Sequence, residues 1–234
     1  MCGRVNIIDE PSVIEMLNEL DAEYEASVIN DLPRLNVGPS EKLPIVIDAG
    51  SSTHVKDAVW WLLLQSSEKG FKANYQWKTF NARAERLRSS KLYSKPFKQS
   101  RCLIPVSAYY EWTKEGEQRY PHMIKPADNS VMAIAGLYKT WDAEDQQVLS
   151  CTVVTTEGHP ELHSIHKKST PVLVPKARWQ EWLDPKQTET SGFDELFAPR
   201  FETEMEVTPV DPQMNSSRIK DHACLSAIGD SFNF

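Results

Sequence analysis

The sequence predicts an α+β fold made of a single domain, residues 1–234, with a mainly antiparallel, barrel-like β-sheet and helices at its flank. Three observations predict it. Short apolar and β-branched runs bounded by turn residues dominate the chain, helical periodicity is confined to a few segments, and no internal repeat or low-complexity linker divides the sequence. A chain of 234 residues that is 40% hydrophobic is long enough to bury one core.

The first predicted element is a short amphipathic helix over residues 11–20. Asp9 ahead of Pro11 is a helix-start signal, and four apolar residues follow at helical spacing: Val13, Met16, Leu17 and Leu20. Strand-like runs then follow one another along the chain: Pro44–Ile47, His54–Leu64, Cys102–Trp112, Tyr120–Ile124, Val131–Leu137, Val148–Thr156, Val172–Val174 and Met205–Val210.

Turn residues connect these runs. Lys114–Glu117 is typical of a hairpin turn, and Asp142–Gln146 is predicted to be another loop. Pro175 is predicted to open a second helix, with Trp179 and Trp182 on one of its sides.

Composition excludes several classes of protein. The longest apolar run, Ala58–Leu64, is far shorter than the roughly 20 residues that cross a bilayer, and acidic residues interrupt the start of the chain before a signal peptide could form. We therefore expect no membrane contact and a cytoplasmic protein. The four cysteines contain no C-x-x-C pair, so free thiols are expected, with no metal site, and Cys102 and Cys151 in strand-like segments are expected in the core. No cofactor motif is found, and nothing argues against a monomer.

Charge is unevenly distributed. The formal net charge is −7, which argues against a protein that coats nucleic acid non-specifically. The window from Asn81 to Arg101 nevertheless carries a net charge of +6, which leaves −13 for the remainder. This basic stripe is either a solvated face or a groove that faces phosphate groups, and composition leaves both interpretations open.

The most specific feature is a cysteine at position 2, followed by Gly3. If Met1 is removed, Cys2 presents an amine and a thiol on adjacent carbons. The amine can form an imine with an aldehyde, and the sulfur can then close a thiazolidine ring on the same carbon. An α-amino group with a pKa of about 7.7 to 8.0 is far more often neutral at pH 7 than a lysine side chain, whose pKa is about 10.4. The alternative is that Met1 stays and Cys2 is a buried strand residue.

Three further residues could carry chemistry. Glu111 falls inside an aromatic strand, so it lies either on a wet face or in the interior as an acid with a raised pKa, which would suit proton transfer. His166 is a candidate proton shuttle with an ordinary pKa near about 6.5, with His159 and His163 as rivals. Asn81 either holds the Cys2 amine or caps a helix that contains Arg83 and Arg86.

Nine motifs taken in order resemble the SRAP domain family, the SOS-response-associated peptidase-like proteins. They are Met1-Cys-Gly-Arg4, Leu35-Asn-Val37, Trp61, Asn81-Ala-Arg-Ala-Glu85, Arg101-Cys-Leu-Ile-Pro105, Tyr110-Glu-Trp112, Ala135-Gly-Leu137, Thr155-Thr156 and Ile165-His166. The match runs from Met1 to the region of Asn215. The resemblance covers nearly the whole chain. It implies a sensor of abasic sites in single-stranded DNA, nucleoid-associated when bound, that crosslinks to the opened deoxyribose through Cys2.

The resemblance also implies a role for each residue of the site. Cys2 is the nucleophile, Asn81 and Glu111 position or activate it, and His166 assists sugar opening and proton transfer. The residues implied to contact DNA are Arg4, Pro39, Trp61, Arg83, Arg86 and Thr155, with Pro39 and Trp61 as wedge or stacking residues. This chain departs from the family pattern after His166, where Lys167-Lys168-Ser169-Thr170 is one residue longer than usual. Lys167 or Lys168 is expected to replace the usual arginine.

Two other functions remain open on the sequence. An N-terminal-nucleophile amidohydrolase would also use Cys2, to attack an amide carbonyl, although the expected glutamine-pocket motifs are not found. A non-covalent single-stranded DNA module would use only the basic stripe and aromatic residues, and Cys2→Ala would leave it intact.

Overall fold

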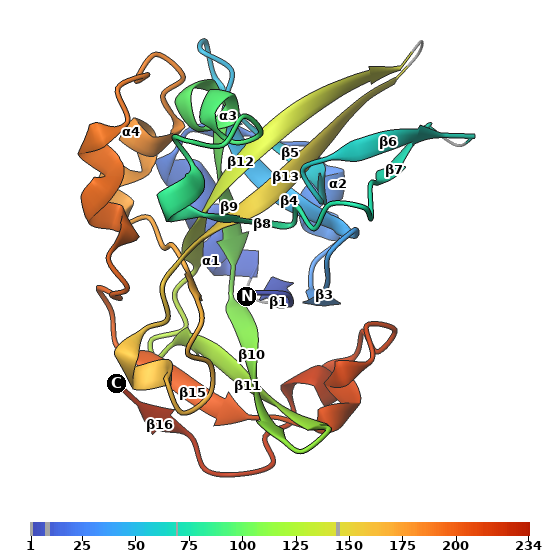
Figure 1. Cartoon of the computed structure of the whole chain (residues 1–234), viewed down its shortest axis with the longest axis vertical. Helices are drawn as coiled ribbons and strands as arrows, with labels where there is room; N and C mark the ends of the chain where they lie inside the picture. The colour runs from blue at the N-terminus through green and yellow to red at the C-terminus, as the bar shows by residue number, and fades with distance from the viewer. Residues whose placement is uncertain (1, 8–9, 69, 144–145) are drawn as a thin grey trace.

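The computed structural model describes residues 2–7, 10–68, 70–143 and 146–234, and it has the α+β architecture that the sequence predicts (Figure 1). Five strands close a barrel, and a second sheet of six strands packs beside it. The chain forms a single domain, so this fold class and its barrel-like sheet are confirmed.

The barrel is built from five strands of six to twelve residues. They are β4 (Lys42–Asp48), β5 (Thr53–Trp60), β9 (Arg101–Val106), β12 (Met132–Ala143) and β13 (Gln146–Thr156). Neighbours pair antiparallel except at the closure, where β13 runs parallel to β5. Three short strands extend this sheet: β2 (Ala22–Glu23), β8 (Asn81–Arg83) and β14 (Thr170–Pro171).

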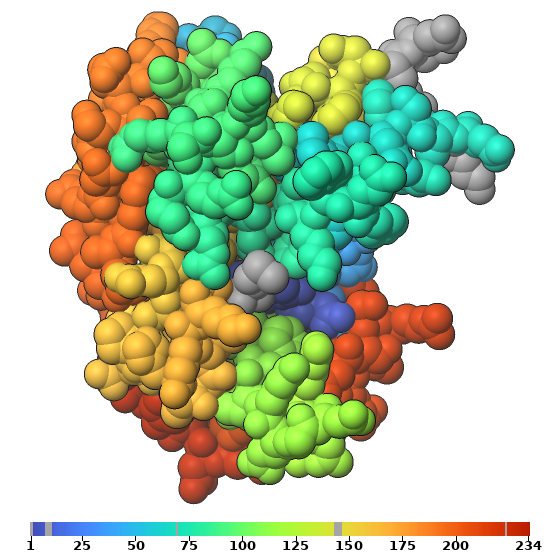
Figure 2. All heavy atoms as spheres, in the orientation of Figure 1, coloured from blue at the N-terminus to red at the C-terminus, as the bar shows by residue number. Residues whose placement is uncertain are grey.

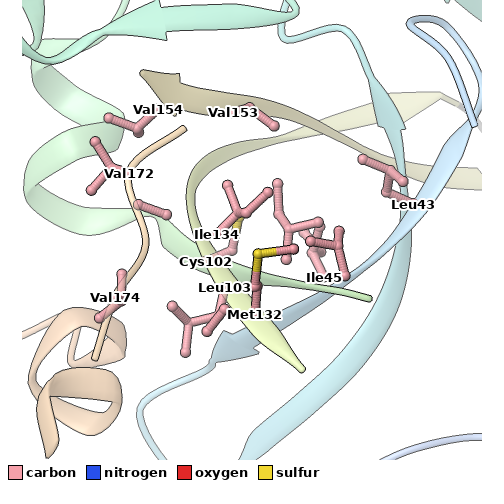
Figure 3. Close-up of a cluster of buried hydrophobic side chains, with 14 of the residues drawn as sticks. Leu43, Ile45, Cys102, Leu103, Met132, Ile134, Val153, Val154, Val172 and Val174 are labelled. Carbon is pink, nitrogen blue, oxygen red and sulfur yellow. The ribbon is translucent and has the colours of Figure 1, made fainter. Parts of the chain in front are cut away.

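Aliphatic side chains fill the barrel. Figure 3 shows Leu43, Ile45, Leu103, Met132 and Ile134 converging between the strands, and each of them is at most 3% exposed. Because each buried aliphatic side chain stabilises the fold by roughly 1.5 to 3 kcal/mol, this cluster holds the barrel as a rigid base. Cys102 and Cys151 are fully buried free thiols in this core, as predicted.

The second sheet carries the N-terminal strand in its middle. Its strands, in spatial order, are β16 (Phe232–Asn233), β15 (Met205–Pro209), β11 (Gln118–Pro126), β10 (Ala108–Glu115), β1 (Val5–Ile7) and β3 (Arg34–Val37). All five pairings are antiparallel, and Gly116, with a φ of 62°, closes the predicted hairpin between β10 and β11. A separate hairpin, β6 (Leu64–Ser67) and β7 (Gly70–Ala73), projects at the right of Figure 1.

The helices are short. The α-helices are α1 (Glu10–Glu19), α2 (Ala26–Asn30), α3 (Ser94–Gln99) and α4 (Trp179–Leu183). The 3-10 helices are η1 (Ala84–Arg86), η2 (Pro160–Leu162), η3 (Lys176–Arg178), η4 (Ser191–Phe197), η5 (Pro212–Asn215) and η6 (His222–Leu225). The two predicted helices are confirmed in α1 and in η3 with α4, where both tryptophans are buried. Within the described ranges, no helix combines the length and apolar character that crossing a membrane requires.

The structure divides, shortens or displaces three of the predicted strands by more than one residue. The run Cys102–Trp112 is two strands, because Ser107 leaves the barrel strand β9 and donates its backbone N–H to the carbonyl of Asn6 in β1, at 2.8 Å. The run His54–Leu64 ends at Trp60, since the following residues turn toward the β6 hairpin. In Val172–Val174 the strand proper is β14, just before it.

The predicted loop Asp142–Gln146 falls partly outside the described residues, which omit 144–145. On either side, β12 and β13 stay paired as far as Ala143 and Gln146. The break at Ser107 matters most for the site, because it places β9 in the barrel and β10 in the second sheet, beside β1.

Candidate functional site

Cys2 lies just before β1 and is fully buried. Its segment is anchored on both sides, because Val5 pairs with Tyr109 of β10 and with Val37 of β3, and the carbonyl of Arg4 accepts the backbone N–H of Tyr110 at 3.1 Å. In Figure 2 the blue N-terminal segment is seen at the bottom of a hollow, between the cyan segments above it and the lime β10–β11 hairpin below it. Met1, and with it the prediction of its removal, lies outside the described residues.

Asn81 reaches the nucleophile candidate directly. It opens β8, and its Nδ2 donates to the carbonyl oxygen of Cys2 at 2.7 Å. The alternative of a helix N-cap is wrong, because Asn81 lies in a strand and the position that precedes η1 is Arg83, which makes no side-chain capping bond. The parallel pairing of β8 with β13 fixes Asn81 next to Val153. The barrel therefore holds Asn81 in position for its hydrogen bond to Cys2.

Glu111 is the buried acid among the alternatives that the sequence allows. It is 3% exposed, and its Oε2 lies 3.4 Å from Nδ1 of His166. Burial raises the pKa of Glu111 to about 7, because removing the carboxylate from water disfavours its charged form. At neutral pH this carboxyl is therefore divided between its protonated and ionised states, as a proton carrier requires.

His166 sits on a loop that backbone contacts hold in place. Its N–H donates to the carbonyl of Leu162 at 2.7 Å, and the N–H of His159 donates to Oγ1 of Thr170 at 2.8 Å. A side chain on Gly158 would place its Cβ only 2.4 Å from the carbonyl oxygen of Lys167, so a glycine is needed for this close approach.

The pKa of His166 differs from the ordinary value on which its prediction as a proton shuttle rests. Burial, together with nearby positive charges that include Lys168 and Arg83, lowers the pKa to about 4. His166 is therefore a neutral imidazole at pH 7, and Glu111 is the group that titrates near neutrality. The two rival histidines have structural contacts: His159 stacks on Phe201, and Nε2 of His163 lies 3.2 Å from the carbonyl oxygen of Gly158.

The thiol of Cys2 also departs from expectation. An unperturbed cysteine thiol has a pKa of about 8.5. Burial and the nearby Glu111 raise the pKa of the Cys2 thiol well above that value. A thiol in this state keeps its proton at neutral pH. Its sulfur can act as a nucleophile only if a neighbouring base takes that proton as the new bond forms.

The residues implied to contact DNA lie around this centre. Arg83 is half-exposed, pairs in register with Thr155, and donates from Nη1 to the carbonyl of Lys168 at 3.4 Å. The side chains of Arg86, Lys167 and Lys168 are exposed. Thr155 is fully buried, and its hydroxyl has no hydrogen-bond partner in the described part of the chain.

The other implied contacts lie beside β3. Arg4 is half-buried, and a Cβ on Gly38 would approach its Nε to 3.0 Å. Pro39 follows Gly38 directly and is half-buried. Burial lowers the pKa of Arg4, although the guanidinium stays charged at neutral pH.

Not all of the basic stripe is available for a ligand. The guanidinium of Arg101 is buried and donates to four backbone carbonyls, those of Phe97, Lys98, Trp182 and Asp184. Arg88 pairs with Asp194 at 2.7 Å and also donates to Thr190. These two arginines hold the barrel against η4 and its neighbours, so they leave the set of cations that could face phosphate.

Two exposed aromatic residues were not identified from the sequence. Tyr75 is 66% exposed and Trp77 is 62% exposed, and both lie in the loop that leads into Asn81. Trp61, the implied stacking residue, is 6% exposed; its ring packs on Tyr75 and Phe80, at centroid distances of 5.1 and 5.4 Å. Two aromatic residues inside the polar stretch 74–79 are the signal that could have found this surface.

The described residues contain no cluster of histidine, cysteine, aspartate and glutamate that could hold a metal ion. A mainly apolar cavity of about 320 Å³ opens between α1, the start of β12 and α4, and none of the predicted site residues lines it. The chemistry-bearing groups therefore gather at the junction of the barrel and the second sheet, where segments far apart in sequence meet.

Comparison with known proteins gives a consistent result. The family model described as SOS response associated peptidase (SRAP) matches residues 1–217. The abasic site processing protein YoqW of Bacillus subtilis is 31% identical over 225 residues, which cover 93% of this chain and 96% of that protein. The abasic site processing protein HMCES of Xenopus tropicalis is 25% identical over 84% of this chain and 66% of its own length. A crystal structure of a Bacteroides thetaiotaomicron protein superposes with a TM-score of 0.79 at 20% identity, covering 97% of this chain and 100% of that one.

Proposed function

Since the chain belongs to the SOS response associated peptidase (SRAP) family, we propose that it processes abasic sites in DNA by capturing them covalently on Cys2. The observation that carries this proposal is the convergence on Cys2 of three segments far apart in sequence. Asn81 holds the Cys2 carbonyl at 2.7 Å, and the Glu111–His166 pair, 3.4 Å apart, lies beside it. Glu111 is close enough for its charge to act on the Cys2 thiol.

The proposed reaction starts after Met1 is removed. The free amine of Cys2 attacks the aldehyde carbon of the opened deoxyribose, and loss of one water gives an imine. The sulfur then adds to the imine carbon: the C–S bond forms, the π electron pair of the C=N bond moves to nitrogen, and that nitrogen takes up a proton. The net reaction joins one aldehyde and one aminothiol into a thiazolidine and releases one water.

Glu111 and His166 divide the proton transfers in this scheme. With a pKa of about 7, Glu111 can take the proton from the Cys2 thiol and return a proton to the nitrogen at neutral pH. His166, with a pKa of about 4, is a neutral imidazole that orients Glu111 and can donate a hydrogen bond to the sugar. This assignment gives the role of proton shuttle to Glu111 rather than to His166, because burial moves the two pKa values in opposite directions.

A single strand is the form of DNA that the surface favours. Trp77 and Tyr75 offer exposed rings next to Asn81, and base stacking on such rings is worth about 1 to 3 kcal/mol per base. The exposed cations Arg86, Lys167 and Lys168 can contact phosphates on either side. We propose that the protein binds this DNA as a monomer, in the cytoplasm and on the nucleoid.

The test mixes purified protein with a single-stranded oligonucleotide that contains one abasic site, and separates the products on a denaturing gel. We expect a heat-stable adduct, none with intact DNA, and none with Cys2→Ala. Cys224→Ala, which removes another buried thiol, is the matched control and should crosslink normally. Mass spectrometry of the purified protein should show Met1 absent. A wild-type protein without an adduct, or one that crosslinks as Cys2→Ala, would refute the proposal.

The amidohydrolase alternative is tested on the same preparation. Release of ammonia from glutamine, lost in Cys2→Ala, would favour that function over lesion capture.

A further inference from the structure

The hydroxyl of Tyr109 is a buried polar group that the scheme above does not use. Tyr109 is fully buried, and its hydroxyl oxygen has no hydrogen-bond partner among the residues that the structure describes. A buried hydroxyl without a partner destabilises a fold by roughly 1 to 3 kcal/mol, and such groups are rare in native proteins. A phenylalanine would fill the same space without that cost. Packing alone therefore does not explain why this residue carries a hydroxyl.

The position of Tyr109 in β10 places it at the reaction centre. Side chains alternate along a strand, so Tyr109 shares a face with Glu111, whereas Tyr110 points to the opposite face. Its backbone pairs with Val5, three residues after Cys2. Glu111 and Cys2 are the two groups whose charges act on the Tyr109 phenol.

The ionisation state of Tyr109 makes it a donor. Burial, and then the negative charges of Glu111 and Cys2, raise the pKa of the phenol well above its ordinary value. The hydroxyl therefore keeps its proton at neutral pH. A protonated phenol can stabilise a forming thiolate by donating a hydrogen bond to it. Hydrogen bonds to charged acceptors are roughly twice as strong as those between neutral groups.

We propose that the Tyr109 hydroxyl is a further catalytic group, which donates a hydrogen bond to the Cys2 sulfur as its proton leaves and the ring closes. The proposal deepens the function proposed above and rests on it. In the step concerned, the thiol proton passes to the Glu111 carboxylate, the sulfur electron pair forms the C–S bond, and the C=N π pair moves to nitrogen. Tyr109 keeps its own proton throughout and stabilises the negative charge that develops on sulfur.

Formaldehyde is the probe that isolates this step from DNA. An N-terminal cysteine converts formaldehyde into a thiazolidine, which adds the mass of one carbon atom to the N-terminal peptide. The experiment follows that mass against time in the wild type, Tyr109→Phe, Tyr110→Phe and Cys2→Ala, and repeats the series with the abasic-site oligonucleotide. Tyr110→Phe is the matched control, because its hydroxyl already donates to the carbonyl of Cys224 at 3.1 Å.

We expect Tyr109→Phe to capture formaldehyde and the DNA lesion about tenfold more slowly, with unchanged affinity for intact single strands. Tyr110→Phe should react at the wild-type rate, although its melting temperature falls. Wild-type rates for Tyr109→Phe with both substrates would overturn the proposal. So would a slow reaction with the lesion alone, which would assign the hydroxyl to the sugar.

The formaldehyde series also separates this proposal from the proposed function. If the wild type reacts with formaldehyde but never with the lesion, lesion capture is refuted, and the role of Tyr109 at the sulfur is still decided by the formaldehyde rates. If Tyr109→Phe is misfolded, its melting temperature falls below that of Tyr110→Phe. In that case Tyr109→Leu, which also lacks the hydroxyl, is compared with Tyr109→Trp, whose indole N–H restores a donor, and a donor that fails to restore the rate would overturn the proposal.

Discussion

The two faces of β10 treat their polar groups in opposite ways. On one face, Tyr110 accepts a hydrogen bond from Asn6 and donates to the carbonyl of Cys224, and Nε1 of Trp112 donates to Asn215 at 2.7 Å. On the other face, Tyr109 and Glu111 are equally buried, the Tyr109 hydroxyl has no described partner, and Glu111 has a raised pKa. Of these two adjacent tyrosines, Tyr110 therefore stabilises the fold, whereas Tyr109 has a hydroxyl that is available for chemistry.

The contrast teaches that hydrogen-bond satisfaction identifies a site better than burial does. Tyr109 and Tyr110 are both fully buried, so exposure does not distinguish them. The satisfied face is completed by the segment after β15, whose residues 214–225 wrap over it: Nδ2 of Asn36 donates to the carbonyls of Met214, Ser216 and Ile219. On the other face the Tyr109 hydroxyl has no described partner, and in our proposal the Cys2 sulfur becomes its acceptor during the reaction.

The largest effect is expected from Glu111→Gln. Removing the group that titrates near neutrality should slow crosslinking by about 100-fold, because general acid–base catalysis contributes at least that much, and should leave affinity for intact single strands unchanged. Single-turnover rates on the abasic-site oligonucleotide, measured beside binding by fluorescence anisotropy, check this. If DNA affinity fell as much as the crosslinking rate, Glu111 would be a DNA-contact residue. The proposed difference between the two faces of β10 would then be wrong.

The same variant should change how stability depends on pH. Burial raises the pKa of Glu111 to about 7 from an ordinary value near 4.5, so the folded state holds more protons than the unfolded state between these values. The contribution of Glu111 to stability is therefore lost as pH rises through this window, by on the order of 3 kcal/mol. Urea unfolding between pH 4 and pH 8 should show that this loss disappears in Glu111→Gln.

His166→Asn is the control with the opposite sign. The pKa of His166 is lowered to about 4 from 6.5, so the unfolded state holds more protons and its contribution to stability rises with pH through that window. Removing His166 should leave the fall caused by Glu111 uncompensated, and the two variants should have slopes of opposite sign. Parallel slopes would mean that these groups do not form the pair described here.

Tyr110→Phe tests the satisfied face. Its removal leaves the side-chain amide of Asn6 and the carbonyl of Cys224 without the phenol, so the free energy of unfolding should fall by about 1 to 3 kcal/mol. Tyr109→Phe should not lower it, since no described bond is broken and the cost of an unpartnered buried hydroxyl is removed. Denaturant melts of both variants in one buffer decide the matter, and equal losses would remove the distinction.

The smallest effect is expected at the surface. Trp77→Ala should weaken non-covalent binding of single strands by about 1 kcal/mol, roughly fivefold, because one stacking ring is lost while the buried centre is intact. Tyr24→Ala, which removes an exposed ring near the other edge of the barrel sheet, is the control and should bind normally. An unchanged affinity for Trp77→Ala would move the strand to another part of the surface.

Local patterns of the sequence predicted much of the fold. The helix of α1, most strands and the Gly116 hairpin follow from periodicity and turn residues. The break at Ser107 did not, because it depends on a contact with Asn6, and no local pattern encodes a contact between distant segments. The same reason explains the pKa values of Glu111 and His166, which arise from burial in the assembled fold.

The site shows the same division. The chemical types of Cys2, Asn81, Glu111 and His166 could be read from the sequence and its resemblance, and the structure brings them together. The structural roles of Arg88 and Arg101 could not be predicted from the sequence, since their carbonyl and carboxylate partners lie far along the chain. The net charge of a sequence window gives the number of cations, but it does not say which of them form ion pairs or hydrogen bonds inside the folded protein.

The pairing of Val5 with Tyr109 also sets an order of events during synthesis. The Cys2 segment leaves the ribosome first, but β10, which covers it, is made much later. A nascent chain that had already lost Met1 would therefore expose its amine and thiol to the aldehydes of metabolism. A thiazolidine formed at that stage would yield a folded protein that is already spent. Keeping Met1 in place until β10 has docked would protect the nucleophile, which makes the timing of its removal part of the reaction.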